Sequence, residues 1–531
     1  MWASRPRDAT TRRAVTIGKE PRLPWPVVPE KSDQISAAQQ RAVTELVALA
    51  PVLDELAELL SGYEVHLVGG SVRDALLGQL AVPEPGGMSP PEAAGGRGTD
   101  AGSRADAADL DVTTDARPAD VLRLVEGWAQ AVWTTGIEFG TVGVQRRGRR
   151  IEITTFRADS YDRSSRNPEV AFGTSLVEDL GRRDFTINAM AISLGADPRF
   201  TDPYGGLADL VGRRLRTPRA PEDSLADDPL RMMRAVRFVS QLGVTLDPAL
   251  LTAVTAMSAE LARITPERVQ AELSKLLLGA WPRRGLELFV STGLAGRVLP
   301  ELPALQMEID EHHQHKDVYS HSLTVLEQAI DQEPAGEPDL VLRLAALLHD
   351  IGKPATRRRE ARGGVSFHHH EVVGARLVKA RLSALRYPKQ VIEDVARLTY
   401  LHLRFHGFGG GEWTDSAVRR YVTDAGPLLS RLHKLVRSDS TTRNLRRARA
   451  LADSYDLLEQ RIAVLLEAED LARVRPDLDG NAIMELLDIP AGPLVGKAWR
   501  YLKELRMDRG PLSRDEAEAE LLTWWAHQPR P

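Results

Sequence analysis

The sequence predicts an α+β fold, with a small mixed-sheet head followed by a long all-helical body. Up to about residue 215, short apolar runs of strand length alternate with helical patterns. After Pro221 the apolar residues recur at helical spacing as far as the C-terminus, with breaks at Pro or Gly. A chain of 531 residues is also too long for one hydrophobic core, so we expect several domains.

Changes in composition divide the chain into five predicted parts. Residues 1–35 combine Pro, Arg and polar side chains without periodicity, which favours a disordered leader over an organelle transit peptide. Residues 81–108 are rich in Pro, Gly, Ala and Asp, and we interpret them as a flexible insertion in the head. The remaining boundaries give a head at 36–215, a helical neck at 216–300, a second helical domain at 301–440 and a helical C-terminal region at 441–531.

Composition limits the chemistry available to the chain. It contains no cysteine, which excludes disulfides, iron–sulfur clusters and thiol nucleophiles and leaves His and carboxylates as metal ligands. The formal net charge is −5, so nucleic-acid binding must rely on local basic patches. Because the sequence shows neither an apolar run of bilayer length nor a secretory signal, we expect a cytoplasmic protein without membrane contact.

The head begins with a predicted strand, glycine turn and helix. Residues 64–68 (EVHLV) have the pattern of a short buried strand, Gly69 and Gly70 follow, and residues 71–77 continue as a helix. Glycine lets the backbone approach a triphosphate, so that its N–H groups point at the phosphates, and Arg73 adds positive charge at the helix start. The turn therefore has the features of a phosphate-binding element.

The next predicted strand, DLDVT, carries two carboxylates. Asp109 and Asp111 are separated by one residue, so on a strand both side chains project from the same face. Adjacent carboxylates repel, and a divalent cation such as Mg²⁺ or Mn²⁺ relieves the repulsion. Two such ions can activate a 3′ hydroxyl and stabilise a leaving pyrophosphate. Glu152, on one of two strands predicted to pair around an Arg-Gly turn, is a candidate third carboxylate or a supporting group.

Two blocks rich in arginine follow. Residues 182–190 (RRDFTINAM) place two arginines and a carboxylate before an apolar segment. In residues 227–238 (DDPLRMMRAVRF), polar residues at three-residue spacing share one helix face, while Met233, Val236 and Phe238 give the helix a core side. The residues of the polar face are Asp228, Arg231, Arg234 and Arg237. We interpret the arginines as the lining of a groove. The alternative is a basic stripe on a solvated surface.

The order of these blocks resembles the class II tRNA nucleotidyltransferases (CCA-adding enzymes) and the similar bacterial poly(A) polymerases. The resemblance covers roughly residues 60–300 well and the helical remainder more loosely. It implies that Asp109 and Asp111 bind the catalytic Mg²⁺, and that the nucleotide is held by Gly70, Arg73, Arg183, Arg234 and Arg237. Two departures from the family pattern are Asp227, where the family usually has Glu, and the insertion at 81–108.

By the same resemblance, Asp228 and Arg231 select the incoming base. A carboxylate accepts a hydrogen bond from the exocyclic amino group of cytosine or adenine, and a guanidinium donates to the adjacent ring nitrogen. Uracil and guanine present a carbonyl and a ring N–H at these positions. The pair would therefore accept C and A and reject U and G without a nucleic-acid template.

The helical body contains a second constellation of possible metal ligands. His, His-Asp and Asp residues follow one another on predicted helices in an order that resembles the HD phosphohydrolase family. The resemblance implies a second divalent metal held by His321, His349, Asp350 and Asp439. A helical core with hydrogen-bonded histidines is the alternative, and a nearby cluster at 312–315 fits a surface loop better than a ligand set.

We therefore predict a tRNA nucleotidyltransferase that adds C and A from CTP and ATP to the tRNA 3′ end. The neck and residues 441–531 are expected to bind RNA, and the basic stretches at 357–359 and 443–449 are candidate phosphate contacts. A poly(A) polymerase or an enzyme that adds A alone is the first alternative. An HD-type phosphohydrolase with an RNA-binding head is the second, and a non-catalytic RNA-binding protein is the third. The sequence predicts no protein partner.

Overall fold

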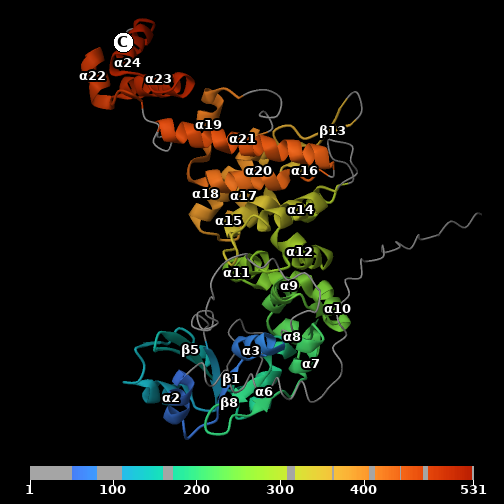
Figure 1. Cartoon of the computed structure of the whole chain (residues 1–531). Coiled ribbons are helices and arrows are strands. Elements are labelled where there is room, and N and C mark those ends of the chain that lie inside the picture. The colour runs from blue at the N-terminus through green and yellow to red at the C-terminus, as the bar shows by residue number, and fades with distance from the viewer. Residues whose placement is uncertain are drawn as a thin grey trace, which may run out of the picture.

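The structure is a computed structural model and describes residues 51–80, 110–158, 171–307, 317–360, 364–405, 413–442, 444–469 and 476–528. The predicted leader at 1–35, the insertion at 81–108 and the histidines at 312–315 lie outside these residues. Figure 1 shows an elongated molecule. The head lies at one end, the helical body extends away from it, and the three last helices form the other end.

The head is built on a seven-stranded mixed sheet with the order β3-β4-β5-β2-β1-β8-β9. Its central strand β2 (Leu110–Thr114) pairs in parallel with β5 (Arg149–Thr155) and antiparallel with β1 (Val65–Val68). The other strands are β3 (Ala131–Trp133), β4 (Thr141–Arg146), β8 (Ala191–Ser193) and β9 (Phe200–Thr201). The predicted α+β class is confirmed, as are the buried strand before Gly69, the strand of Asp111 from Leu110 onward and the β4–β5 hairpin.

Short helices cover this sheet and anchor the loops that reach the site. They are α2 (Pro51–Leu59), α3 (Gly70–Leu80), α5 (Pro118–Val125), α6 (Leu176–Gly181) and α7 (Gly206–Val211). The start of α7 packs tightly on the turn at Thr186–Asn188, since a Cβ at Gly206 would lie 2.1 Å from the Thr186 carbonyl oxygen. The buried Asp209 carboxylate accepts a 2.7 Å hydrogen bond from the Thr186 hydroxyl. Both contacts fix the segment that follows Arg183.

The neck consists of α8 (Pro221–Asp227), α9 (Leu230–Leu242), α10 (Pro248–Met257), α11 (Pro266–Leu277), α12 (Pro282–Ser291) and α13 (Leu294–Val298). Helix α9 packs against α11 and α12 through a face that includes the fully buried Met233 and Val236. Close approach is possible because Gly279 and Gly285 lie against Ser240, whose hydroxyl also donates to the Leu276 carbonyl oxygen. Helix α9 is therefore held between the head and the upper body (Figure 1).

The upper body contains α14 (Val318–Ile330), α15 (Leu340–Leu348), α16 (Lys353–Thr356), α17 (His370–Ala384), α18 (Lys389–Leu401), α19 (Asp415–Ala425), α20 (Leu429–Asp439) and α21 (Leu445–Glu469). Its apolar residues belong to one continuous core that also includes the neck and the head sheet. The buried Arg343 on α15 donates to the carbonyl oxygens of Leu277 and Gly279, so α15 is tied to the end of α11.

The last three helices, α22 (Gly480–Leu487), α23 (Pro493–Arg509) and α24 (Arg514–Ala526), enclose a separate apolar cluster. The buried Leu458 and Ile462 of α21 belong instead to the main core. The boundaries predicted for the five parts of the chain stay predictions. Within the described residues, none of the helices has the length and apolar character needed to cross a bilayer.

Candidate active site

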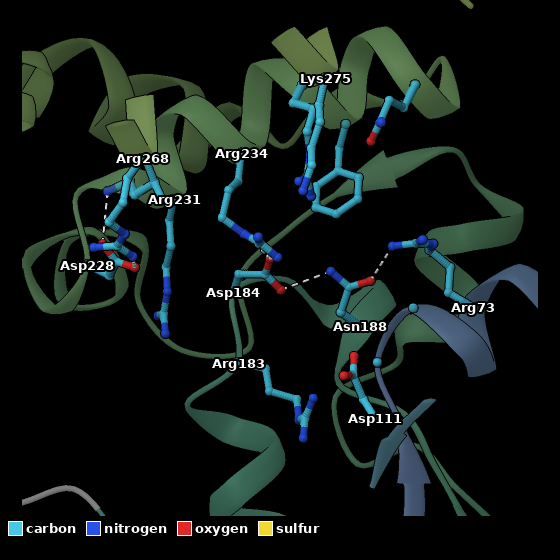
Figure 2. A pocket seen from close by; sticks show the side chains of 16 residues that line it. Arg73, Asp111, Arg183, Asp184, Asn188, Asp228, Arg231, Arg234, Arg268 and Lys275 are labelled. Atoms are coloured by element: carbon cyan, nitrogen blue, oxygen red, sulfur yellow. Dashed lines mark hydrogen bonds and ion pairs between the residues drawn. The ribbon is translucent and has the colours of Figure 1, made fainter. Parts of the chain in front are cut away.

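A cavity of about 580 Å³ lies where the head meets α9 and α11 (Figure 2). Seven cationic side chains and three carboxylates line it, so the cavity is positive and suits a polyanion such as a nucleoside triphosphate. The structure brings all the predicted nucleotide-binding residues to this one cavity, together with Asp111. These residues are Gly70, Arg73, Arg183, Asp228, Arg231, Arg234 and Arg237.

Asp111 lies beside the glycine turn at one side of the cavity. Gly69 has a φ of +75°, which glycine adopts without strain, and a Cβ at this position would lie 3.2 Å from Asp111 Oδ2. The turn thus packs directly against the carboxylate. Asp111 is in register with Glu152 on the neighbouring strand β5, so both side chains project from the same face of the sheet. Asp109 lies outside the described residues, and its pairing with Asp111 stays a prediction.

The buried carboxylate of Asp184 occupies the middle of the cavity. Its Oδ2 accepts a 2.7 Å hydrogen bond from Arg234 Nε, and its Oδ1 accepts from the Asn188 amide at 2.9 Å. Asn188 in turn accepts from Arg73 at 2.7 Å. Burial alone would raise the pKa of Asp184, but the Arg234 guanidinium and these hydrogen bonds hold it well below its usual value. Asp184 is therefore ionised and fixes cationic side chains from both the head and the neck.

The proposed base-selecting residues lie at the opposite side of the cavity from Asp111. The sequence predicted that Asp228 lies on the same helix as Arg231, and this prediction is wrong. Asp228 is extended at the end of α8, and its Oδ1 accepts from the Leu230 backbone N–H at the start of α9. Its Oδ2 accepts a 2.9 Å hydrogen bond from Arg268. Arg231 donates to the Ser224 hydroxyl at 2.7 Å and to the Arg182 carbonyl oxygen. Asp228 and Arg231 are thus each held in place by other residues, and not by a bond between the two.

Arg237 is a buried member of the arginine stripe, so the stripe is not a solvated surface. Its guanidinium lies 3.1 Å from Glu272 of α11, and Arg234 lies 3.7 Å from the same carboxylate. Burial and the neighbouring Arg234 lower the pKa of Arg237 to about 10. Arg237 therefore remains protonated at neutral pH, although other guanidinium groups lie close to it.

Several cavity residues had no role in the sequence analysis. Asp184 was part of a recognised block, and Asn188 stands four residues after it, so spacing could have suggested the pair. Arg268, in the first turn of α11, and Lys275, in its last turn, come from a helix with no motif signal. Only the packing of α11 on α9 places them at the cavity, and a local pattern could not have shown it.

A second cluster of titratable side chains is buried between the helices of the upper body. The four predicted ligands meet here, and two further histidines join them: His370 at the start of α17 and His402 at the end of α18. His321, His349 and Asp439 form one triad of ligand atoms, and Asp350, His370 and His402 form another. No ligand role was predicted from the sequence for these two histidines.

The hydrogen bonds of this cluster leave lone pairs facing its centre. His349, His370 and His402 each direct Nδ1 at the backbone carbonyl oxygen three residues earlier, at 2.6–2.9 Å. Nδ1 must carry the proton in such a bond, so in the neutral imidazole Nε2 presents its lone pair. Yet His349 Nε2 lies 3.2 Å from Asp350 Oδ2, and His370 Nε2 lies 3.3 Å from His402 Nε2. Pairs of lone-pair atoms at these distances need a cation between them.

The charges of the cluster, like its hydrogen bonds, favour a cation at its centre. Burial would lower the pKa of His349, but the carboxylates of Asp350 and Asp439 outweigh burial and raise it to about 10. A proton on His349 is thus one way to supply the cation. A divalent metal is another, and the mixture of imidazole nitrogens with carboxylate oxygens is typical of first-row metal sites. The residues present therefore fit a metal centre.

Comparisons with known proteins match three consecutive family models to the chain. Residues 65–216 match the poly(A) polymerase head domain, and residues 243–305 match a probable RNA and SrmB-binding site of polymerase A. Residues 318–444 match the HD domain. The first model covers the head sheet with Asp111 and the glycine turn, and the third covers the buried His-Asp cluster.

Relatives extend the similarity along the chain. An A-adding tRNA nucleotidyltransferase of Deinococcus radiodurans is 36% identical over 362 residues, which are 67% of this chain and 81% of that protein. A CCA-adding enzyme of Levilactobacillus brevis is 40% identical over 245 residues, 46% of this chain and 53% of that protein. The crystal structure of the Bacillus stearothermophilus CCA-adding enzyme in complex with CTP superposes with a TM-score of 0.60 at 26% identity. That superposition covers 91% of this chain and 98% of that one.

A mixed-sheet head joined to a helical body defines the nucleotidyltransferase class of fold. The chain belongs to the family of class II tRNA nucleotidyltransferases and bacterial poly(A) polymerases, in the branch that carries an HD domain. Membership of this family implies a divalent metal. The chain spans only about half of the CCA-adding relative from L. brevis but most of the A-adding one.

The Asp184→Asn variant should lose the ion pair between residue 184 in the head and Arg234 in the neck. We expect a loss of about 2 kcal/mol in unfolding free energy at pH 7, less than for a fully buried pair because Arg234 is 31% exposed. The pKa of Asp184 is lowered on folding, so its contribution is full above the unfolded value of 3.8, decreases below it, and is lost as pH falls through the lower folded value. Urea titrations at pH 7 and pH 3 test this. If the difference in unfolding free energy between the wild type and the variant were the same at pH 7 and pH 3, the prediction would be contradicted.

Proposed function

We propose that this chain is a tRNA nucleotidyltransferase that adds C and A residues, from CTP and ATP, to the tRNA 3′ end. One observation carries the proposal: a single positive cavity contains Asp111, the glycine turn, the arginine cluster and the Asp228–Arg231 pair. Asp111 and the base-selecting pair lie on opposite sides of it, as the phosphates and base of one nucleotide require. A tRNA substrate would place the activity in the cytoplasm.

Asp109 and Asp111 would hold Mg²⁺ or Mn²⁺ at the strand β2 end of the cavity. Carboxylate oxygens are the ligands these ions prefer, and Glu152 lies in register beside Asp111 as a supporting carboxylate. When bound, the metal would supply charge stabilisation for the attacking 3′ oxygen and the leaving pyrophosphate. Arg73, held by Asn188, and Arg183 would bind the phosphates from either side of the glycine turn.

Asp228 and Arg231 would act as a rigid protein template. Asp228 keeps an acceptor oxygen in place because Arg268 and the start of α9 both donate to it. Arg231 is fixed through Ser224 and the Arg182 carbonyl oxygen, which leaves part of its five N–H groups for a base. Preorganised partners of this kind select C and A by hydrogen-bond pattern, since a mismatched base would leave buried polar groups unpaired.

Folded RNA would approach through exposed arginines of the helical body. Arg358 and Arg359 form β12 and are exposed, and Arg446, Arg447 and Arg449 are exposed at the start of α21. Arg443 lies outside the described residues. Such side chains would bind phosphates without reading sequence, so tRNA binding should weaken as salt rises.

Addition of A alone is the second candidate within the same family, because the relative from D. radiodurans carries that name. An assay with each labelled nucleotide in turn separates the candidates. tRNA without its 3′ CCA should take up C, and tRNA ending in CC should take up A. Uptake of A only would replace our proposal with the A-adding activity, and long runs of A would indicate a poly(A) polymerase.

Asp111→Asn should abolish nucleotide incorporation without unfolding the head. The amide keeps the shape but loses the charge that holds a divalent ion, and we expect incorporation to fall by about 10³-fold or more. Asp54→Asn on the exposed side of α2 is the matched control and should keep full activity. Wild-type incorporation by the Asp111→Asn variant would refute the metal role.

Asp228→Ala should relax base choice more than it lowers total activity. Losing one member of the pair should reduce the preference for C over U by roughly 10- to 100-fold, as expected for one bidentate base contact. Glu222→Ala, an exposed carboxylate on the preceding helix α8, is the control. Competition between labelled CTP and UTP measures the ratio. An unchanged ratio in the Asp228→Ala variant would exclude the template role.

We propose a metal-dependent phosphohydrolase activity as a second function of the chain, located in the HD domain. The six-residue cluster supports it, because its inward-facing lone pairs and two carboxylates suit two divalent ions. Lys353 Nζ lies 2.9 Å from Asp350 Oδ2 and adds a cation beside the cluster. The ions would activate water against a phosphate ester, while Lys353 would attract the phosphate.

His370→Ala should remove this hydrolysis and leave nucleotide addition intact, because the two sites use different residues. His368→Ala is a matched control from the same run of three histidines: its side chain is 75% exposed and directed away from the ligand set. Hydrolysis of 2′,3′-cyclic and simple phosphate esters is measured with added divalent metals. Equal hydrolysis by both variants would show that His370 is not a ligand.

A further inference from the structure

Three arginines of the cavity surround one aromatic ring. The guanidinium carbons of Arg237, Arg73 and Arg234 lie 4.3, 5.2 and 5.8 Å from the centroid of the Phe238 ring. Phe238 itself lines the cavity although it is only 2% exposed. Sequence periodicity assigned it to the core side of α9, and its packing against Phe185, edge to face with centroids 5.6 Å apart, agrees with that.

Each of these arginines also has polar partners, but no single polar group is shared by all three. Arg73 donates to Asn188 and pairs with the exposed Asp74, while Arg234 pairs with Asp184. Arg237 pairs with Glu272, which also lies 3.7 Å from Arg234. The ring of Phe238 contacts all three. Arg73 comes from α3 in the head, whereas the other two come from α9 in the neck, so the ring stands where the two parts of the cavity meet.

The electrostatics of the cavity explain why an aromatic ring suits this position. Three guanidinium groups around one point repel each other, and the lowered pKa of Arg237 records part of that repulsion. A carboxylate at this point would neutralise the charge that a triphosphate needs. An aromatic face attracts cations through its quadrupole and adds no net charge. It therefore reduces the cost of gathering the arginines and keeps the cavity positive.

We infer that Phe238 is a positioning residue, which gathers Arg73, Arg234 and Arg237 into a binding site for the triphosphate of the incoming nucleotide. The inference rests on the proposed function of the cavity. Phe238 acts through the three arginines and does not itself touch the reacting atoms. Plain core packing is the competing role, and it would depend on the size of the ring but not on its quadrupole.

Fluorination separates these two roles, because it weakens the quadrupole in steps and changes ring size little. Mono-, di- and trifluorophenylalanine are placed at position 238 of the full-length protein. Binding of ATP and of inorganic tripolyphosphate is measured by calorimetry in Mg²⁺ buffer, with KM and kcat for ATP in parallel. The same series at Phe289, a fully buried ring on α12, is the control for packing.

We expect affinity for both ligands to fall stepwise at position 238, to about tenfold at the trifluoro ring, with KM rising in parallel and kcat within about twofold. Phe238→Leu should lose at least as much. The Phe289 series should leave affinity unchanged. A flat series at position 238, an equal loss at Phe289, or a fall in kcat without loss of affinity would overturn the inference.

The two ligands also separate this inference from the proposed function. If the wild type binds tripolyphosphate but adds no nucleotide, the proposed function fails, while the affinity series still supports or overturns the role of Phe238. If the wild type binds neither ATP nor tripolyphosphate, both are overturned.

Discussion

The buried carboxylate of Asp184 is the interaction on which the cavity depends. It lies between the head and the neck and accepts hydrogen bonds from Asn188 on one side and Arg234 on the other. Through Asn188 it also sets Arg73 beside the glycine turn. Without an ionised group at this point, Arg234 would lose its carboxylate partner in the head, and Asn188 would lose the acceptor that orients it toward Arg73. One buried negative charge thus makes it possible to assemble a site for a polyanion.

Rigid packing behind the cavity gives this interaction its geometry. Helix α9 carries three of the arginines, and α11 supplies Arg268, Lys275 and the carboxylate of Glu272. The far end of α11 is tied to α15 through Arg343, whose guanidinium also pairs with Glu333. The neck therefore connects the nucleotide cavity to the HD domain through packed helices and buried hydrogen bonds.

Local sequence patterns predicted most elements of the head but only part of the site. The strand before Gly69, the Asp111 strand and the arginine helix have clear periodicity, so their elements and the residues on them could be predicted. Residues that enter through packing could not: Arg268 meets Asp228 across 40 positions of sequence, and no pattern marks it. His370 and His402 were visible as histidines, but their convergence on Asp350 depends on how α17 and α18 pack. The position of Asp228 differed because a proline after it delays the start of α9.

The two buried sites use opposite charge balances, and this explains why overall charge was a poor guide to function. The chain has a net charge of −5, yet the cavity between head and neck contains more guanidinium groups than carboxylates. In the HD domain the balance is reversed, since the carboxylates of Asp350 and Asp439 lie among the histidines and raise the pKa of His349. The first arrangement favours a bound anion and the second a bound cation. Each burial of like charge is costly alone, so each site is most stable when it holds the ligand its chemistry requires.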